Sequence, residues 1–272
     1  GEEYVYSNFG YCVLGRVIEA VTGEPYEQAV RARVLAPLGI EDMQIGRSLP
    51  EERAEGEVVY HDQKQRTSAA VKAPGREVPI GYAHDQEVMD AHGAWIASAA
   101  DLARFAGAFS DPSTCPLLRE ESIREMWAPQ EEEHGAVWYG LGWLVRDVGG
   151  ERRNAWHNGL LTGGTSTIMV RRYDGFSWAV LFNTDRSATT RKTLAGLVDP
   201  LVHRAVDGIE LCFRDHGYFK HGTGRSRKKL MTGLVRRIRA TVNKAGESKG
   251  KRLLIGARVF PTLEECLFLG LD

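Results

Sequence analysis

The stretch TSTIMVRRYDGFSWAVLFN, residues 165–183, carries the clearest fold signal in this chain. Two runs rich in β-branched and aromatic residues flank Asp174-Gly175, a dipeptide that is typical of the turn of a β-hairpin. In the second run, apolar residues occupy both sets of alternating positions: Phe176, Trp178, Val180 and Phe182 in one, Ala179 and Leu181 beside Ser177 in the other. We therefore expect this strand to be covered on both faces.

Strand signals extend upstream to WYGLGWLVRDV, residues 138–148, which is aromatic and β-branched. Before it the pattern is helical. Apolar residues recur at helical spacing from Val13 to Val21, and Gly23 then fits a helix C-terminus. Residues 26–34 predict a second helix. Ser98 and Asp101 form a variant of the capping box at the start of a third.

Residues 47–92 are polar and irregular, and loops of this length are usually functional or mobile. A helix is predicted over residues 190–206. Residues 1–207 are thus predicted to have an α/β fold of the α+β type. In this fold an antiparallel sheet is flanked by helices and accompanied by a helical lobe.

The last 65 residues differ in charge and in pattern. Residues 208–272 contain 14 Lys and Arg against 6 Asp and Glu, whereas residues 1–207 contain 21 against 30. The strand-like segments IELCF (209–213) and RLLIGARV (252–259) flank a basic amphipathic helical segment, which predicts a β-α-β unit with parallel strands. We therefore expect two units, residues 1–207 and residues 208–272, and the second could be either a fragment of a second domain or a fusion remnant.

Composition excludes several classes of function. The formal net charge of -1 gives no general attraction to nucleic acid or membrane, and no apolar run approaches the roughly 20 residues that span a bilayer. The basic segment lacks interleaved aromatic residues, so a solvated helix face is favoured over a nucleic-acid site. The chain starts at Gly1 without a Met or a signal sequence, so we expect it to be part of a longer polypeptide.

The four cysteines are widely spaced, with no C-x-x-C and no paired Cys/His spacing. A zinc site is therefore not expected, and we interpret them as ordinary core or surface residues. They are Cys12, Cys115, Cys212 and Cys266. No other metal or cofactor is expected, and neither the cellular compartment nor the oligomeric state follows from the sequence.

Two short motifs could carry chemistry: Tyr6-Ser7-Asn8 at the mouth of the first helix, and WHNGLLTGG at residues 156–164. With VLAPLGI, SAADLARF and YGLGW, they follow the order seen in penicillin-recognising serine hydrolases. The first 205 residues therefore resemble this family of class C-type β-lactamases, D,D-peptidases and related esterases. Residues 208–272 more weakly resemble one slice of a glycosidase-type (β/α)-barrel.

The resemblance implies roles for five residues. In the family, a serine in an S-x-x-K turn attacks the substrate, and the tyrosine of Y-x-N completes a proton relay. Tyr6 would be that tyrosine, and Asn8 would position the lysine or the substrate amide. His157 and Gly159 would form the H-x-G wall, and the Leu160 N–H would join an oxyanion hole. No metal or cofactor is needed, and the partner is a small-molecule or peptide substrate.

Structural interpretations remain open for each of these residues. Tyr6 could be a packed aromatic residue, Asn8 could be a helix N-cap, and His157 could be structural. Ser7 is interpreted only as the spacer of the motif. For His84, Asp85 and His92 in the long loop, the structural interpretation is favoured over a place at the mouth of a pocket.

Two departures from the family affect the expected function. His157 stands where many members have Lys, and a mostly neutral histidine favours ester or peptide substrates over β-lactams. The S-x-x-K motif lies upstream of Y-x-N in the family, whereas only five residues precede Tyr6 here. The strings Ser226–Lys229 and Ser248–Lys251 lie in the wrong order and are rejected as nucleophiles.

We therefore expect the 272-residue chain alone to be inactive. We also expect it to leave apolar surface uncovered around residues 176–182, because the missing part of the family fold would supply a helix and strands. The alternative from another class of function is a non-catalytic module that binds a peptide or glycan in a hydrolase-like pocket.

Overall fold

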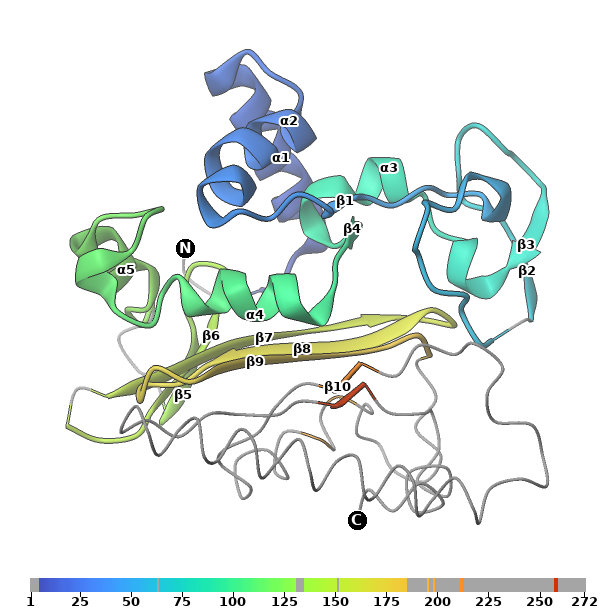
Figure 1. Cartoon of the computed structure of the whole chain (residues 1–272). Helices are drawn as coiled ribbons and strands as arrows, with labels where there is room; N and C mark the ends of the chain where they lie inside the picture. Colours follow the sequence, from blue (N-terminus) through green and yellow to red (C-terminus); the bar gives the residue numbers. More distant parts are fainter. Residues whose placement is uncertain are drawn as a thin grey trace, which may run out of the picture.

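The computed structural model describes residues 5–184, except 63, 131–134 and 151, together with residues 195, 198, 211–212 and 257–258. Its centre is a five-stranded antiparallel sheet in the order β5-β6-β7-β8-β9. Figure 1 shows α4 (Ala99–Gly107) along one face of this sheet, with α1 (Asn8–Thr22) and α2 (Tyr26–Val30) beyond it. The predicted class, an antiparallel sheet flanked by helices with a helical lobe, is confirmed.

The strands of the sheet follow the predicted pattern. They are β5 (Val137–Tyr139), β6 (Leu144–Asp147), β7 (Arg153–Leu161), β8 (Thr165–Arg171) and β9 (Ser177–Phe182). Asp174 and Gly175 form the β8–β9 turn as predicted, and Gly175 has a φ of 83°, a conformation that glycine adopts without strain.

The first helix begins and ends where its residues predict. Gly23, with a φ of 72°, ends α1 in the left-handed conformation, and its N–H donates to the Glu19 carbonyl. The N-cap, however, is Ser7, whose Oγ accepts from the Gly10 N–H at 3.0 Å. The interpretations of Ser7 as a mere spacer and of Asn8 as the cap are therefore wrong. Asn8 is the first helical residue, and its side chain is not needed for capping.

The second helix is followed by two short turns of other helical types. After α2, a π-helical turn (Arg31–Leu35) and a 3-10 turn (Ala36–Leu38) follow. Ser98 caps α4 by accepting from the Asp101 N–H at 3.0 Å, as the capping-box variant predicts. Another 3-10 turn (Pro112–Thr114) and α5 (Glu120–Met126) follow α4.

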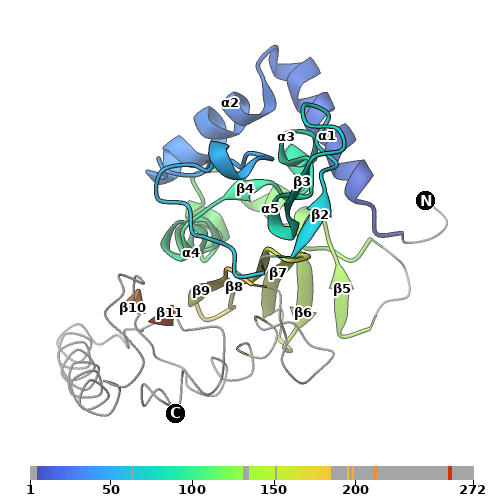
Figure 2. The same cartoon turned by 90° about the vertical axis from the view of Figure 1, so that its right-hand side faces the viewer.

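The long polar segment contains short regular elements rather than one continuous loop. Figure 2 shows them as a group above one end of the sheet. They are β1 (Gln44–Ile45) paired with β4 (Trp95–Ile96), β2 (Gln65–Thr67) paired with β3 (Glu77–Pro79), α3 (Gln86–Met89), and the 3-10 turns Pro50–Glu52, Ile80–Tyr82 and Asp90–His92.

Both faces of the sheet are buried, as the composition of β9 predicts. The α4 face is covered by Phe109, Ile123, Trp127, Trp138, Trp143, Val145 and Ala155. The opposite face carries a second cluster of Ile168, Val170, Trp178, Phe182 and Ala195. Trp178 and Phe182 are each only 7% exposed, so the expectation of uncovered apolar surface around residues 176–182 is wrong.

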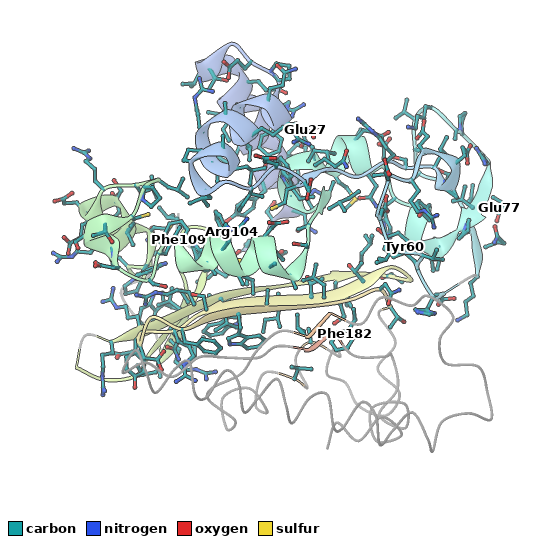
Figure 3. All side chains as sticks on the ribbon, viewed as in Figure 1. Glu27, Tyr60, Glu77, Arg104, Phe109 and Phe182 are labelled. Carbon is teal, nitrogen blue, oxygen red and sulfur yellow. The ribbon has the colours of Figure 1, made fainter. Side chains whose placement is uncertain are left out.

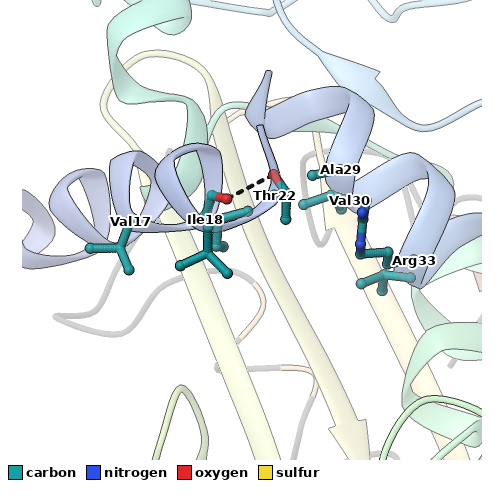
Figure 4. Close-up of a pocket in the computed structure, with 8 residues that line it drawn as sticks. Val17, Ile18, Thr22, Ala29, Val30 and Arg33 are labelled. Carbon is teal, nitrogen blue, oxygen red and sulfur yellow. Dashed lines mark hydrogen bonds between the residues drawn. The ribbon is translucent and has the colours of Figure 1, made fainter. Parts of the chain in front are cut away.

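The uncovered apolar surface lies instead on α1. Phe9, Val13, Val17 and Val21, spaced four residues apart, are 77%, 44%, 49% and 81% exposed and form a stripe along the helix. Near its C-terminal end, α1 and α2 enclose a hollow of about 320 Å³ (Figure 4), lined by Val17, Ile18, Val21, Thr22, Ala29, Val30, Arg33 and Val34. The lining is mostly aliphatic and offers no acid, base or nucleophile suited to catalysis.

A buried arginine fastens the sheet to the helical layer. Arg171, at the end of β8, is 5% exposed, and its guanidinium lies 4.7 Å from the centre of the Trp127 ring. It donates to the carbonyls of Phe109 and Ser110 just after α4, at 2.9 and 2.8 Å, and to the Arg153 carbonyl of β7 at 2.9 Å. One side chain therefore joins α4, β7 and β8.

Little of the C-terminal unit lies within the described residues. Leu211–Cys212 (β10) pairs in parallel with Ala257–Arg258 (β11), which agrees with the parallel strands predicted for the β-α-β unit. Ala195 and Val198 are helical, as predicted for residues 190–206. The remainder of that helix, the boundary at residues 207 and 208, the basic helical segment and Cys266 lie outside the described residues.

We predict that Arg171→Leu lowers the free energy of unfolding by about 3 kcal/mol, because several buried carbonyls lose their donor and each such loss costs about 1–3 kcal/mol. Urea unfolding measures the effect. The control is Arg124→Leu. Its side chain is 73% exposed and forms a surface ion pair with Glu120, so its removal should cost less than about 1 kcal/mol. Equal losses for the two variants would contradict the role assigned to Arg171.

Candidate functional site

Tyr6 and Asn8 lie at the N-terminal end of α1. The Tyr6 side chain is 56% exposed, and its ring meets that of Tyr139 edge to face, with centroids 6.2 Å apart and an angle of 86°. Asn8 is exposed on the first turn, and its side chain makes no hydrogen bond to any described residue. Both side chains are thus accessible to an approaching group.

Tyr139 connects the two predicted motifs. Its hydroxyl lies 2.7 Å from Nε2 of His157, and the two rings meet edge to face with centroids 5.8 Å apart. His157 stands in β7 opposite Met169 of β8. Tyr6, Tyr139 and His157 therefore form a row of rings that runs from the chain before α1, through the end of β5, to β7.

Sequence reasoning missed Tyr139, although a signal was present. It is the first residue of YGLGW, a segment used only to recognise the family. The glycines of this segment fix its position. A Cβ at Gly140 would collide with the carbonyl oxygen of Met126 in α5, and the neighbouring Leu141 N–H donates to that oxygen at 2.8 Å. The Gly140 N–H donates to the Trp143 carbonyl at 2.7 Å, which closes the β5–β6 turn.

Gly159 and Leu160 lie on the part of β7 that has one described neighbour. β6 pairs with β7 only as far as Trp156, whereas β8 pairs along its whole length to Leu161. Among the described strands, none borders residues 157–161 on the β6 side. Because backbone groups of a strand point alternately to its two sides, some N–H groups of this segment face away from β8.

Close packing explains the glycine at position 159. A Cβ on Gly159 would lie 2.7 Å from Oγ1 of Thr167, its partner on β8. Leu160, opposite Ser166, is 56% exposed, so it presents an apolar side chain at the surface beside the two predicted motifs.

The three loop residues have structural partners. Asp85 caps α3 by accepting from Val88 N–H at 3.2 Å, and it also accepts from Val71 N–H at 2.9 Å. Nδ1 of His92 lies 3.1 Å from the sulfur of Cys12, so the 3-10 turn Asp90–His92 contacts α1 here. These contacts favour the structural interpretation for Asp85 and His92.

His84 has a different environment. Its Nε2 is buried without a hydrogen-bond partner among the described residues, and its ring is bonded to the Thr162 backbone. Thr162 lies in the β7–β8 turn, where Gly163 packs against Ile80 so closely that a Cβ would overlap it. The 3-10 turn Ile80–Tyr82, just before His84, therefore packs against the β7–β8 turn, and β7 carries His157.

Partial burial favours the neutral form of His84, His92 and His157. Desolvation lowers the pKa of His157, and the hydrogen bond between its Nδ1 and the Asn158 carbonyl, 2.8 Å long, only partly opposes this. Desolvation is also the largest cause that lowers the pKa of His84 and of His92. The lowered pKa favours an uncharged ring at position 157 at neutral pH.

The described residues contain no group of three or more His, Cys, Asp or Glu side chains arranged to hold a metal ion. Cys12 and Cys115 are free thiols. Within the same part of the chain, no helix combines the length and apolarity required to cross a bilayer.

Comparison with known proteins agrees with the motif order. The β-lactamase family model matches residues 1–202. Penicillin-binding protein 4 of Amycolatopsis lactamdurans is 26% identical over 192 residues, which cover 65% of this chain and 46% of that protein.

Two solved structures share the fold. A D-stereospecific amidohydrolase from Streptomyces sp. is 28% identical, with a TM-score of 0.51, over 67% of this chain and 51% of that one. The D-amino acid amidase from Ochrobactrum anthropi SV3, complexed with L-phenylalanine, is 23% identical, with a TM-score of 0.53, over 75% and 58%. This chain thus spans about half the length of these relatives.

We predict that the free energy of unfolding falls as the pH decreases from about 6.5. His84, His92 and His157 are half-buried, and desolvation lowers their pKa values from the ordinary 6.5, so the unfolded chain takes up protons first. Their contribution is complete above pH 6.5 and is lost as the pH falls through the folded pKa values. His157→Gln should reduce the difference in urea stability between pH 7.5 and 5.5. His61→Gln, at an exposed position, is the control, and equal behaviour of both variants would contradict the burial of His157.

Proposed function

Because this chain belongs to the β-lactamase family, we propose that its site hydrolyses ester or amide bonds through a serine acyl-enzyme. The observation that carries this proposal is the row of Tyr6, Tyr139 and His157. Tyr139 contacts both Tyr6 of the Y-x-N motif and His157 of the H-x-G motif, so it connects the two motifs. Tyr6 and His157 lie 151 positions apart in the sequence, so the contacts that connect them are long-range.

Tyr6 would move the proton of the reaction. Its ring is 56% exposed and meets Tyr139 edge to face, which leaves room for a serine and a lysine from an S-x-x-K segment to approach its hydroxyl. A tyrosine accepts a proton near neutral pH only beside a fixed positive charge, which the lysine would provide. Asn8, one residue beyond the cap, would hold the lysine or the substrate amide through its side-chain amide.

The acylation step then balances as follows. Tyr6 takes the proton of the serine hydroxyl, and the serine oxygen bonds to the substrate carbonyl carbon, whose oxygen becomes an oxyanion. The oxyanion is stabilised by the Leu160 N–H on the part of β7 without a described β6 neighbour, together with the N–H of the serine. As the carbonyl reforms, the bond to the leaving alcohol or amine breaks, and the tyrosine proton passes to the leaving group. Water then attacks the ester, and the same relay returns the serine.

Relatives support amides as well as esters. The Streptomyces sp. relative, at 28% identity, is a D-stereospecific amidohydrolase. The neutral His157 supports the finer proposal that β-lactams are poor substrates, because their carboxylate would meet no cation on this wall.

The nucleophile is assigned to a segment outside the 272 residues, and the chain by itself is proposed to be inactive. The strings at Ser226 and Ser248 lie outside the described residues, and their position after both motifs departs from the family order. A non-catalytic module that binds a peptide or glycan is the competing outcome, and the upstream coding sequence separates the two. An S-x-x-K motif before Y-x-N supports the enzyme, whereas its absence supports the binding module.

We predict that a polypeptide containing this chain and the upstream S-x-x-K segment cleaves p-nitrophenyl acetate or butyrate with a larger kcat/KM than a chromogenic cephalosporin. Tyr6→Phe should lower ester kcat by about 10²–10⁴-fold, the range for loss of a general base. Tyr173→Phe changes a 40% exposed tyrosine in the turn between β8 and β9 and should leave the ester kcat unchanged. A faster cephalosporin reaction would refute the substrate assignment, and an unaffected Tyr6 variant would remove Tyr6 from the mechanism.

A further inference from the structure

The hydrogen bonds of His157 define which of its nitrogens carries a proton. Nδ1 lies 2.8 Å from the carbonyl oxygen of Asn158. A carbonyl oxygen can only accept, so Nδ1 must donate. In the neutral ring Nε2 is then bare, and it accepts from the Tyr139 hydroxyl 2.7 Å away.

The other protonation states fit less well. With the proton on Nε2, the bare Nδ1 would face the Asn158 carbonyl, and two acceptors would oppose each other at 2.8 Å. A doubly protonated ring could keep both contacts, but partial burial opposes its charge, because desolvation is the largest influence on His157 and lowers its pKa. Of the titratable groups, Tyr139 contacts the ring directly and Tyr6 lies beyond it.

We propose that Tyr139 is a positioning residue that locks His157 as the neutral Nδ1–H tautomer. Both ring nitrogens are then committed to the protein: one to the backbone of β7 and one to the hydroxyl at the end of β5. His157 can offer a substrate neither a positive charge nor an N–H. It forms a neutral, shape-defining wall rather than a ligand for an anionic group.

The same tyrosine also limits the position of the Tyr6 ring. Tyr139 meets Tyr6 and His157 edge to face, at 86° and 85°. Its own place is set by the Gly140 contact with α5, so it cannot shift toward either neighbour without disturbing the β5–β6 turn. Tyr139 therefore links the proton-relay side of the site to its substrate wall.

This arrangement predicts a substrate class, an inference that rests on the proposed function. Substrates whose scissile bond is followed by a free carboxylate lose an ion pair that a lysine or an imidazolium would provide. Substrates with an uncharged group there, such as simple amides and alkyl esters, lose nothing. The exposed Leu160 beside this wall adds apolar surface for such a group.

The direct test uses the 272-residue chain with ¹⁵N-labelled histidine and NMR at pH 7. The His157 signals are identified by their loss in His157→Gln. We expect a protonated Nδ1, a bare Nε2 and a single tautomer. Tyr139→Phe should produce a mixture of tautomers and raise the pKa of His157, because the donor to the bare nitrogen is lost. Tyr173→Phe is the matched control. A protonated Nε2 or an imidazolium in the unsubstituted chain would overturn the proposal.

A second readout measures selectivity in the polypeptide that carries the S-x-x-K segment. The probes are a pair of peptide substrates that differ only in a free C-terminal carboxylate or its amide. We expect the amide to have the larger kcat/KM, and Tyr139→Phe to shrink this preference, because a raised pKa of His157 would let an imidazolium meet the carboxylate. The change should appear mainly in KM for the carboxylate substrate. An unchanged preference with an altered tautomer would overturn the substrate inference.

The two proposals can fail separately. If no ester or amide is cleaved by the longer polypeptide, the proposed function fails, but the tautomer measured by NMR still decides the role of Tyr139. If hydrolysis occurs while the tautomer is the opposite one, the proposed function survives and the role of Tyr139 falls.

Discussion

The fold depends on the contact between the sheet and its helical layer, and the guanidinium of Arg171 hydrogen-bonds across this contact. A buried Arg is costly unless its donors are satisfied, and here they bond backbone carbonyls after α4 and on β7. These bonds connect the end of α4 to β7, the strand that carries His157 at its middle. The apolar cluster around Trp127 and Trp143 then fills the space between the two layers.

The candidate site follows from this rigid base. β7 pairs with both neighbours at Ala155 and Trp156, whereas β8 is its one described neighbour as far as Leu161, so the strand is anchored before His157 and accessible after it. Tyr139 reaches the accessible end because YGLGW turns tightly over α5. The contacts made by Tyr139 therefore bring an exposed helix terminus and a half-paired strand into one site. We propose that the neutral His157 suits this site to uncharged groups.

The sequence predicted the sheet better than it predicted the site. Asp174-Gly175 and the doubly apolar β9 encode local geometry and burial directly, so the hairpin and its two covered faces could be inferred. The cap at Ser7 was missed because Ser7 was interpreted only as the spacer of Y-x-N, although serine is a favoured N-cap residue. Tyr139 was missed because its role depends on long-range contact with His157. The exposed stripe on α1 was also missed, since periodicity shows which face is apolar but not whether a neighbour covers it. Residues 208–272 are still proposed to form a separate unit.

The central claim is that Tyr6 serves a serine nucleophile that lies before it in the polypeptide. The most direct measurement is labelling with a fluorophosphonate, followed by peptide mapping, on the 272-residue chain and on a polypeptide that includes the upstream S-x-x-K segment. The account predicts stoichiometric modification of that upstream serine in the longer polypeptide and of no serine in the shorter chain. Modification of a serine within residues 1–272, Ser226 and Ser248 included, would contradict it.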